Sequence, residues 1–149
     1  MAAATLAGPA SKTKAARKTT RRKPASAVAT SARTVVLLKA FFTAIDVLNL
    51  NLHDAAAVLA TSEKSIRRYR TAQGSPDLNR DQVDRIVLVI GIYESLRDIF
   101  SGNPLAIEWL RRPNKDFGGQ RPLDRLRAGS MRDLADVQRY LVAHNGGVW

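Results

Sequence analysis

Two observations predict an all-α protein. From Thr34 to Trp149, apolar residues recur at steps of three and four, which is the spacing of amphipathic helices. Short groups of Gly, Pro and Asn separate these periodic segments, and such residues end helices. No 18 apolar residues follow one another in the 149-residue chain, so we expect no membrane span. The sequence therefore predicts a small helical body behind a basic N-terminal segment.

The first 33 residues differ from the rest of the chain in charge. They contain eight of the 24 Lys and Arg residues, none of the 13 Asp and Glu residues, and no aromatic residue. The basic positions are Lys12, Lys14, Arg17, Lys18, Arg21, Arg22, Lys23 and Arg33. Such a segment buries too little apolar surface to offset its ordering entropy, so we expect residues 1–33 to be a disordered tail. It could be an electrostatic arm that follows nucleic-acid phosphates, a solvated leader that aids solubility, or a transit peptide.

Residues 34–100 are expected to form the first folded part, with four helices. The first carries one apolar stripe, made of Val35, Leu38, Phe41, Phe42, Ile45 and Leu48. A short second helix covers residues 52–59. Ser62 is expected to cap a third helix that runs from Glu63 to about Gln73, where Gly74 and Pro76 end it.

The fourth segment, residues 81–100, could be a strand or a helix. The run Ile86–Ile90 has the β-branched content of a buried strand. However, the apolar residues keep helical spacing over about 20 residues, which is far longer than a usual strand. We therefore expect a helix about 30 Å long. Because it is apolar almost all round, it should be the central and most buried helix.

Residues 101–149 are expected to form a second, smaller helical part. Asn103 is the expected N-cap of a helix with Pro104 in its first turn. A loop of about ten residues follows, with a turn at the adjacent glycines 118 and 119. Residues 122–127 make a short helix ended by Gly129, and Ser130 caps the last helix. The inner face of that helix is expected to hold Leu134, Val137, Tyr140 and Leu141.

The segment 52–71 has the features of a helix-turn-helix. Ala56 is the small residue where the two helices touch, and Ala60-Thr61 lies at the turn. Three apolar residues lock the second helix onto the first, namely Leu59, Ile66 and Tyr69. The predicted DNA-contacting residues are the outward polar ones, Ser62, Lys64, Ser65, Arg67, Arg68 and Arg70.

Physical chemistry favours DNA as the partner of this second helix. Lys64 and Arg68 are four residues apart and share a face, so both can reach guanine edges in the major groove. Ser62 and the first helical amides lie at the end that approaches phosphates. Arg67 and Arg70 flank that face and are better placed for the phosphate backbone. The alternative is a solvated basic helix in an ordinary bundle.

The segment 52–71 resembles the helix-turn-helix of the Xre/Cro-like family, with Ala60 in place of the more common glycine. The C-terminal part contains Trp109-Leu110-x-x-Pro113-Asn114 and then Phe117-Gly118-Gly119-x-x-Pro122-Leu123-x-x-Leu126, followed by a final helix. This series resembles the toxin-binding region of the Xre/MbcA/ParS antitoxins. The resemblance covers about residues 35–149, and the final helix departs from it in lacking the family's glycine-rich approach.

The resemblance implies an antitoxin of a type II toxin–antitoxin pair in the bacterial cytoplasm, associated with the nucleoid. Its partner would be a RES-domain toxin that consumes NAD⁺ or uses it for ADP-ribosylation. The C-terminal region would cover the toxin's active site, and the N-terminal part would form a homodimer that binds operator DNA. The expected toxin-binding residues are Arg111, Arg112, Asn114, Gly118, Gly119, Arg121, Arg125, Arg139 and Trp149.

The C-terminal part is rich in arginine, which suits a partner pocket that receives pyrophosphate or is lined with acids. Core packing is the simpler role for Trp109, Pro113 and Leu123. The last two residues, Val148-Trp149, could be either a frayed end or an anchor on the partner.

The sequence holds little for catalysis. It has no cysteine, and we expect its two histidines, His53 and His144, to be surface residues near a helix start and a helix end. No nucleophile motif, phosphate loop or carboxylate pair is present, so we expect no enzyme, cofactor or metal site. The alternatives to an antitoxin are a stand-alone helix-turn-helix regulator, a nucleoid-associated structural protein and an uncharacterised enzyme.

Overall fold

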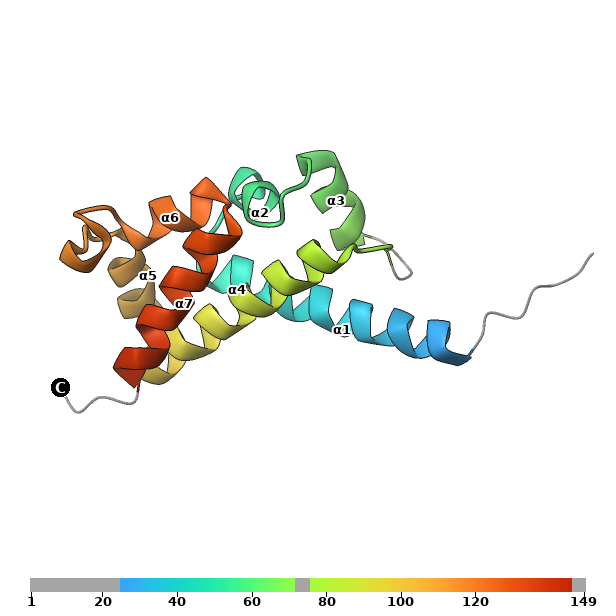
Figure 1. Ribbon diagram of the computed structural model, residues 1–149, viewed down its shortest axis with the longest axis horizontal. Helices are drawn as coiled ribbons and strands as arrows, with labels where there is room; N and C mark the ends of the chain where they lie inside the picture. Colours follow the sequence, from blue (N-terminus) through green and yellow to red (C-terminus); the bar gives the residue numbers. More distant parts are fainter. Residues whose placement is uncertain (1–24, 72–75, 146–149) are drawn as a thin grey trace, which may run out of the picture.

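The computed structural model describes residues 25–71 and 76–145, with side chains from residue 31 onward. Within these ranges every regular element is a helix, which confirms the all-α prediction (Figure 1). The elements are α1 (Ala25–Val47), α2 (Leu52–Val58), α3 (Glu63–Thr71), α4 (Arg80–Ile99), α5 (Asn103–Arg111), the 3-10 helix η1 (Lys115–Phe117), α6 (Pro122–Ala128) and α7 (Met131–Asn145).

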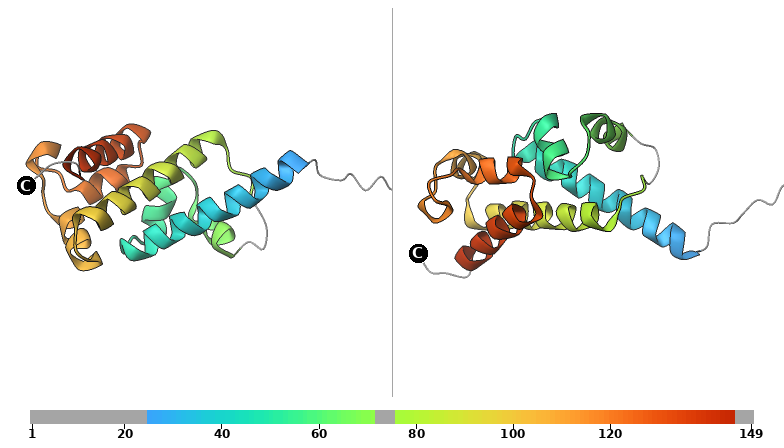
Figure 2. Two further views of the ribbon diagram at one scale, coloured as in Figure 1. Left: turned by 90° about the horizontal axis from the view of Figure 1, so that it is seen from below. Right: turned by 45° about the horizontal axis from the view of Figure 1, so that its top comes forward.

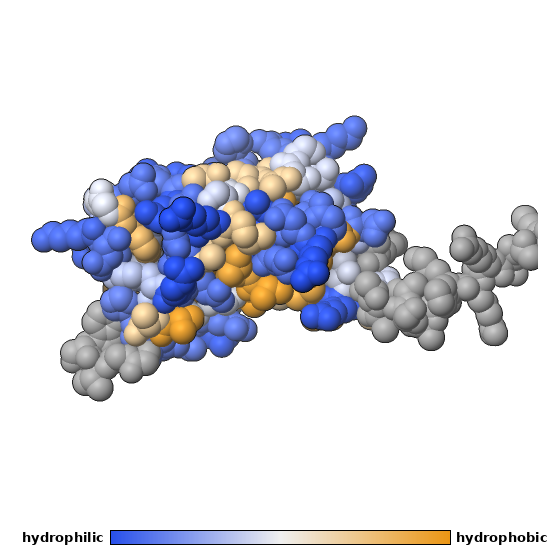
Figure 3. Space-filling view, viewed as in Figure 1, coloured by the Kyte–Doolittle hydropathy of each residue, from blue (hydrophilic) through white to orange (hydrophobic). Residues whose placement is uncertain are grey.

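The long helix α4 is the centre of the molecule, as its apolar run predicts. It lies between α7 on one side and α1 on the other (Figure 2). The β-branched run lies within one α-helix, which confirms the helical prediction, and Ile86, Ile92 and Leu96 are almost completely buried. Val87 is an exception, because it is about half exposed. Figure 3 shows apolar surface over α4 and the adjoining part of α1.

One continuous core joins the two parts of the chain. Its buried residues run from Leu38 on α1 to Leu141 on α7, and they form a single cluster. The inner face predicted for α7 is confirmed, since Leu134, Val137 and Leu141 are buried and Tyr140 is partly so. The helices of both parts therefore pack around one shared core and do not form two separate domains.

Side-chain caps fix several helix starts. Asn51 and Asn79 each form a capping box with the residue three positions on. Ser130 accepts a hydrogen bond from the amide of Asp133 at 3.0 Å, as its predicted cap requires. The prediction for α5 is wrong by one residue, because Gly102 is the N-cap and makes no side-chain hydrogen bond there.

Helix α1 begins at Ala25, well before the expected start near Thr34. Its first half therefore includes residues 25–33, which we expected in the disordered tail. These residues are rich in Ala, Ser and Thr and have no apolar stripe, so the periodicity rule did not detect them. Residues 1–24, with most of the basic positions, lie outside the described residues.

Three contacts lock α2 to the corner between α6 and α7. The guanidinium of Arg127 pairs with the buried carboxylate of Asp54 at 2.8 Å. The buried Arg85 of α4 donates to the carbonyls of Val58 and Gly129. Gly129 has φ +69°, and a Cβ there would lie closer than 3.0 Å to the carbonyl oxygen of Ala57. The C-terminal corner thus holds the helix-turn-helix in place.

Among the residues that the structure describes, no helix is long and apolar enough to cross a membrane.

Candidate functional site

Helices α2 and α3 form the predicted helix-turn-helix, with α3 at one end of the molecule (Figure 1). The small Ala56 is buried, and the three locking residues Leu59, Ile66 and Tyr69 are buried as expected. The turn uses a left-handed residue at Ala60, with φ 51°. The amides of Ala60 and Thr61 donate back to α2 carbonyls, which closes the helix end.

The start of α3 presents Ser62, Lys64, Ser65 and Arg68 together. The hydroxyl of Ser62 accepts a hydrogen bond from the amide of Ser65 at 3.1 Å, so it caps α3. Lys64 and Arg68 are exposed, and neither pairs with an acid among the described residues. Arg68 lies over the ring of Tyr69, 5.4 Å from its centroid. Both cations are therefore accessible to an anionic partner.

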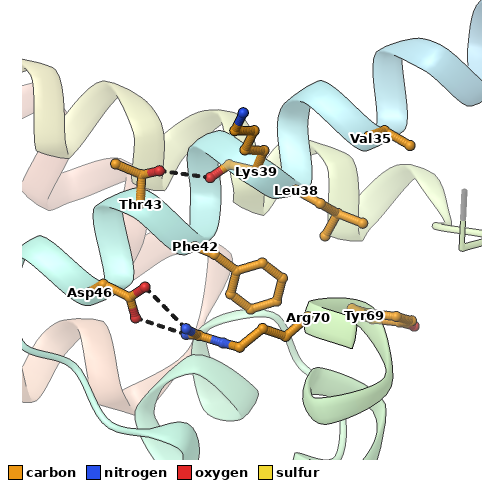
Figure 4. A pocket seen from close by; sticks show the side chains of 8 residues that line it. All are labelled: Val35, Leu38, Lys39, Phe42, Thr43, Asp46, Tyr69 and Arg70. Atoms are coloured by element: carbon orange, nitrogen blue, oxygen red, sulfur yellow. Dashed lines mark hydrogen bonds and ion pairs between the residues drawn. The ribbon is translucent and has the colours of Figure 1, made fainter. Parts of the chain in front are cut away.

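Two other predicted DNA-contacting arginines have partners within the chain. Arg67 lies 3.6 Å from Glu63 one turn earlier. Arg70 forms two hydrogen bonds with Asp46 of α1, at 2.8 and 3.0 Å, and stacks over the ring of Phe42 (Figure 4). Arg70 thus holds α3 against α1 rather than pointing freely to solvent.

At the other end of the molecule, Asn114 organises the loop between α5 and α6. Its side chain accepts a hydrogen bond from the amide of Asp116 at 3.0 Å, and its carbonyl accepts from Phe117 and Gly119. Gly118 and Gly119 are left-handed and exposed, which confirms the expected turn. The loop is therefore built by its own backbone and presents its tip to solvent.

Most arginines of the C-terminal part are paired with acids on their own chain. The pairs are Arg112–Glu108, Arg121–Asp124, Arg125 with Asp133 and Asp136, Arg127–Asp54, Arg132–Asp136 and Arg139–Asp136. Arg111 and Lys115 are the exposed cations of this region that pair with no acid among the described residues. Arg112, Arg132 and Arg139 nevertheless remain largely exposed, and Asp136 is shared by three arginines.

Arg125 is part of the internal packing of the C-terminal part. Its guanidinium lies over the ring of Phe117, 4.9 Å from the centroid, and 3.6 Å from both Asp133 and Asp136. Arg121 forms two hydrogen bonds with Asp124, at 2.7 and 2.8 Å. Its hydrogen bonds with Asp124 lower the pKa of that carboxyl group below its usual range, and they raise the pKa of Arg121.

Aromatic side chains line the inner side of this part. Trp109 stacks on Tyr140 with the ring centroids 6.0 Å apart, and Phe117 lies 4.9 Å from the same ring.

Leu123 is buried as expected, but Pro113 is exposed, so its predicted core role is wrong. A hollow of about 300 Å³ is lined by Trp109, Arg112, Pro113, Asn114 and Lys115.

The histidines lie where the sequence placed them, although His144 is partly buried. His53 is exposed near the start of α2, 3.4 Å from Glu63, and His144 packs on the ring of Tyr140 near the end of α7. Among the described residues, no group of three or more His, Cys, Asp or Glu side chains could hold a metal ion. The predicted toxin-binding residue Trp149 lies outside the described residues.

Sequence reasoning missed the residues that join the two ends. Asp54 and Arg127 are 73 positions apart, and no local pattern links them. The only available signal was an acid at the third position of a helix, which predicts a capping box and not a distant partner. Nothing in the sequence indicated the burial of Arg85, because an arginine on a helix is normally expected to be exposed to solvent.

Two family models match the chain, and together they cover most of it. Residues 27–91 match the antitoxin Xre-like helix-turn-helix domain. Residues 95–147 match the antitoxin Xre/MbcA/ParS C-terminal toxin-binding domain. The boundary between the two matches falls inside α4, whose residues contribute to the single core.

Two individual proteins are similar to the chain. The uncharacterised protein y4oB of Sinorhizobium fredii (strain NBRC 101917 / NGR234) is 34% identical over 118 residues, which cover 78% of this chain and 90% of that protein. The crystal structure of the M. tuberculosis MbcT–MbcA toxin–antitoxin complex contains a chain of similar fold, with a TM-score of 0.55 and 22% identity. The match covers 76% of this chain and 97% of that one. The chain therefore belongs to the Xre/MbcA/ParS family of antitoxins, with a helix-turn-helix domain followed by a toxin-binding domain.

Proposed function

We propose that this antitoxin neutralises a RES-domain toxin that consumes NAD⁺, by covering the toxin's active site. We further propose that it binds operator DNA as a homodimer through α3 and represses its own operon in the bacterial cytoplasm. Residues 34–100 would read DNA and dimerise, and residues 101–149 would bind the toxin. The chain acts by binding, without a cofactor.

One observation supports this division most strongly: exposed cations that pair with no acid among the described residues lie both on α3 and beside the loop after α5, while Arg33 and Lys39 are further such cations on α1. Lys64 and Arg68 are at the start of α3. Arg111 and Lys115 flank the loop after α5, inside the segment that matches the toxin-binding family domain. Each end can therefore meet its own anionic partner without rearrangement of the other.

The DNA-binding role is tested by a mobility-shift assay on the DNA upstream of the gene. Replacing Arg68 by alanine should weaken specific binding by about 1–3 kcal/mol, which is about 5- to 150-fold. Arg132→Ala on α7 is the matched control, because Arg132 is exposed and lies outside the helix-turn-helix. An unchanged midpoint for the Arg68 variant would contradict the assignment of α3.

The toxin-binding role is tested by co-expression with the neighbouring toxin gene. Deleting α7 would be uninformative, since Leu134, Val137 and Leu141 belong to the core and the truncated chain would not fold. The double variant Arg111→Glu/Lys115→Glu should instead lose protection of growth while remaining folded. Lys64→Glu/Arg68→Glu is the matched control and should still protect.

The sequence also allows a stand-alone regulator. This alternative predicts a different result in the co-expression experiment. It would bind the upstream DNA through α3 in the same way, but no neighbouring gene product would depend on it for neutralisation. Failure of the wild-type chain to protect cells from its neighbour, combined with intact operator binding, would favour that alternative.

A further inference from the structure

A hollow of about 300 Å³ opens between the end of α5 and the loop that follows this helix (Figure 1). Cavities of about 150 Å³ already hold benzene, so this hollow has room for an acidic side chain. It is lined by Trp109, Arg112, Pro113, Asn114 and Lys115. All five lie in the segment 95–147 that matches the toxin-binding domain, but that match does not say which surface of the domain contacts a toxin.

The polar side chains of this hollow offer mainly hydrogen-bond donors. The indole of Trp109 has only an N–H group, which donates no hydrogen bond to another described residue. Asn114 uses its side-chain oxygen on the amide of Asp116, so its NH₂ group is the free end. Arg112 and Lys115 are cations and carry no acceptor. Such a set favours a ligand with anionic oxygen atoms.

The free charge of the hollow is a single positive one. Arg112 pairs with Glu108 one turn earlier, although its side chain stays 74% exposed. Lys115 is exposed and pairs with no acid among the described residues. The next residue, Asp116, lines a different hollow, beside α7. One free ammonium group balances the single charge of a carboxylate, whereas the pyrophosphate of a dinucleotide carries more negative charge.

The walls of the hollow are held in place by contacts within the chain. Trp109 packs against Phe100 and Tyr140, with ring centroids 6.2 and 6.0 Å away. The loop is closed at its base, because the amide of Asn114 donates to the carbonyl of Gln120 at 3.0 Å. A preformed site loses little conformational entropy on binding, and an aromatic wall excludes water from a charge pair.

The second hollow of this domain differs in its charge. It has a volume of about 400 Å³ and lies among η1, α6 and α7. Its charged lining residues are two acids and two arginines, namely Asp116, Asp136, Arg125 and Arg139. Both arginines pair with Asp136, so this second hollow does not favour anions.

We propose that the hollow beside Trp109 receives the carboxylate of an Asp or Glu side chain of the toxin, and that this carboxylate pairs with Lys115. The methylene groups of the acidic side chain lie against Trp109 and Pro113. This inference rests on the toxin neutralisation in the proposed function, and it names the surface and the chemistry of the contact.

Zero-length cross-linking of the purified complex with the proposed toxin tests this pair directly. A carbodiimide activates carboxyl groups, and an amine in contact with an activated carboxyl group forms an amide bond with it. Mass spectrometry should find Lys115 joined to an Asp or Glu of the toxin. Lys115→Arg is the matched control, because it keeps the charge and the binding but its guanidinium forms no such bond. A cross-linked complex in which Lys115 is never joined to the toxin would overturn the proposal.

Calorimetric titration of the full chain with the same toxin is the second measurement. Lys115→Glu should weaken binding about 10-fold or more, because it places a like charge opposite the carboxylate. Arg132→Glu changes the net charge equally but lies on α7, where its side chain is 92% exposed, so it should weaken binding less than about threefold.

The outcomes of the titration separate this inference from the proposed function. Equal losses in the two variants would overturn the inference and leave toxin binding itself intact. Weaker operator binding by Lys115→Glu, with unchanged toxin affinity, would assign the hollow to nucleic acid and would also overturn it. A wild type that forms no complex with the toxin would contradict the proposed function, and this inference with it.

Discussion

At the scale of single residues, Ala60 carries strain that glycine would relieve. Its φ of 51° lies in the left-handed region, which costs a non-glycine residue about 1–2 kcal/mol. Part of the gain is offset, because glycine also loses about 0.4–1 kcal/mol of backbone entropy. Ala60→Gly should therefore raise the melting temperature by about 2–4 °C. Ala143→Gly, in the regular helix α7, should lower it, and a loss at both positions would contradict the turn described here.

Arg70 and Arg68 are two positions apart on α3 but have different roles. Arg70→Ala removes the Asp46 pair and the stacking on Phe42, so we expect a loss of about 1 kcal/mol. Arg68→Ala changes an exposed cation and should cost less than about 0.5 kcal/mol. Chemical denaturation of both variants measures the difference. Equal losses would mean that the Asp46 pair contributes nothing.

At the scale of elements, Gly129 decides how closely α2 approaches the α6–α7 corner. Gly129→Ala adds both a left-handed alanine and a clash with the carbonyl of Ala57. Gly118 has nearly the same φ, but open space surrounds it. Gly118→Ala should thus cost about 1 kcal/mol and Gly129→Ala at least about 2 kcal/mol more. Similar costs for the two variants would contradict the close contact.

The first turn of α6 has a pH-dependent contribution from Asp124. Its pKa is lowered in the folded state by Arg121, so the pair stabilises the fold above the ordinary aspartate pKa of about 3.9. That contribution disappears as the pH falls from there through the lowered pKa. Wild type should therefore melt slightly above Asp124→Asn at pH 7, and the difference should shrink as the pH falls below about 3.9. A difference that persists in acid would point to packing rather than charge.

At the scale of the whole molecule, helix positions followed from sequence because each buried face repeats with helical spacing. The run Ile86–Ile90 shows this well, since only the spacing of its neighbours separates a helix from a strand. The first half of α1 escaped prediction for the same reason, because its sequence repeats no apolar pattern with helical spacing.

The candidate sites were predictable in their location but not in their chemistry. Sequence placed the exposed cations Lys64 and Arg68 on one face of α3. It could not show that Arg70 pairs with Asp46, or Arg127 with Asp54, because these partners meet only through the tertiary fold. For the same reason, a count of arginines could not show which of them pair with acids of the same chain.

The central claim of the proposed function is that two ends of one helical body bind two different partners independently. The most direct test is one strain that carries the gene of the proposed toxin and a reporter under the proposed operator. Arg68→Ala should release the reporter while cells continue to grow. Arg111→Glu/Lys115→Glu should keep the reporter repressed while growth stops. Loss of both activities in either variant, with the protein folded, would contradict the account.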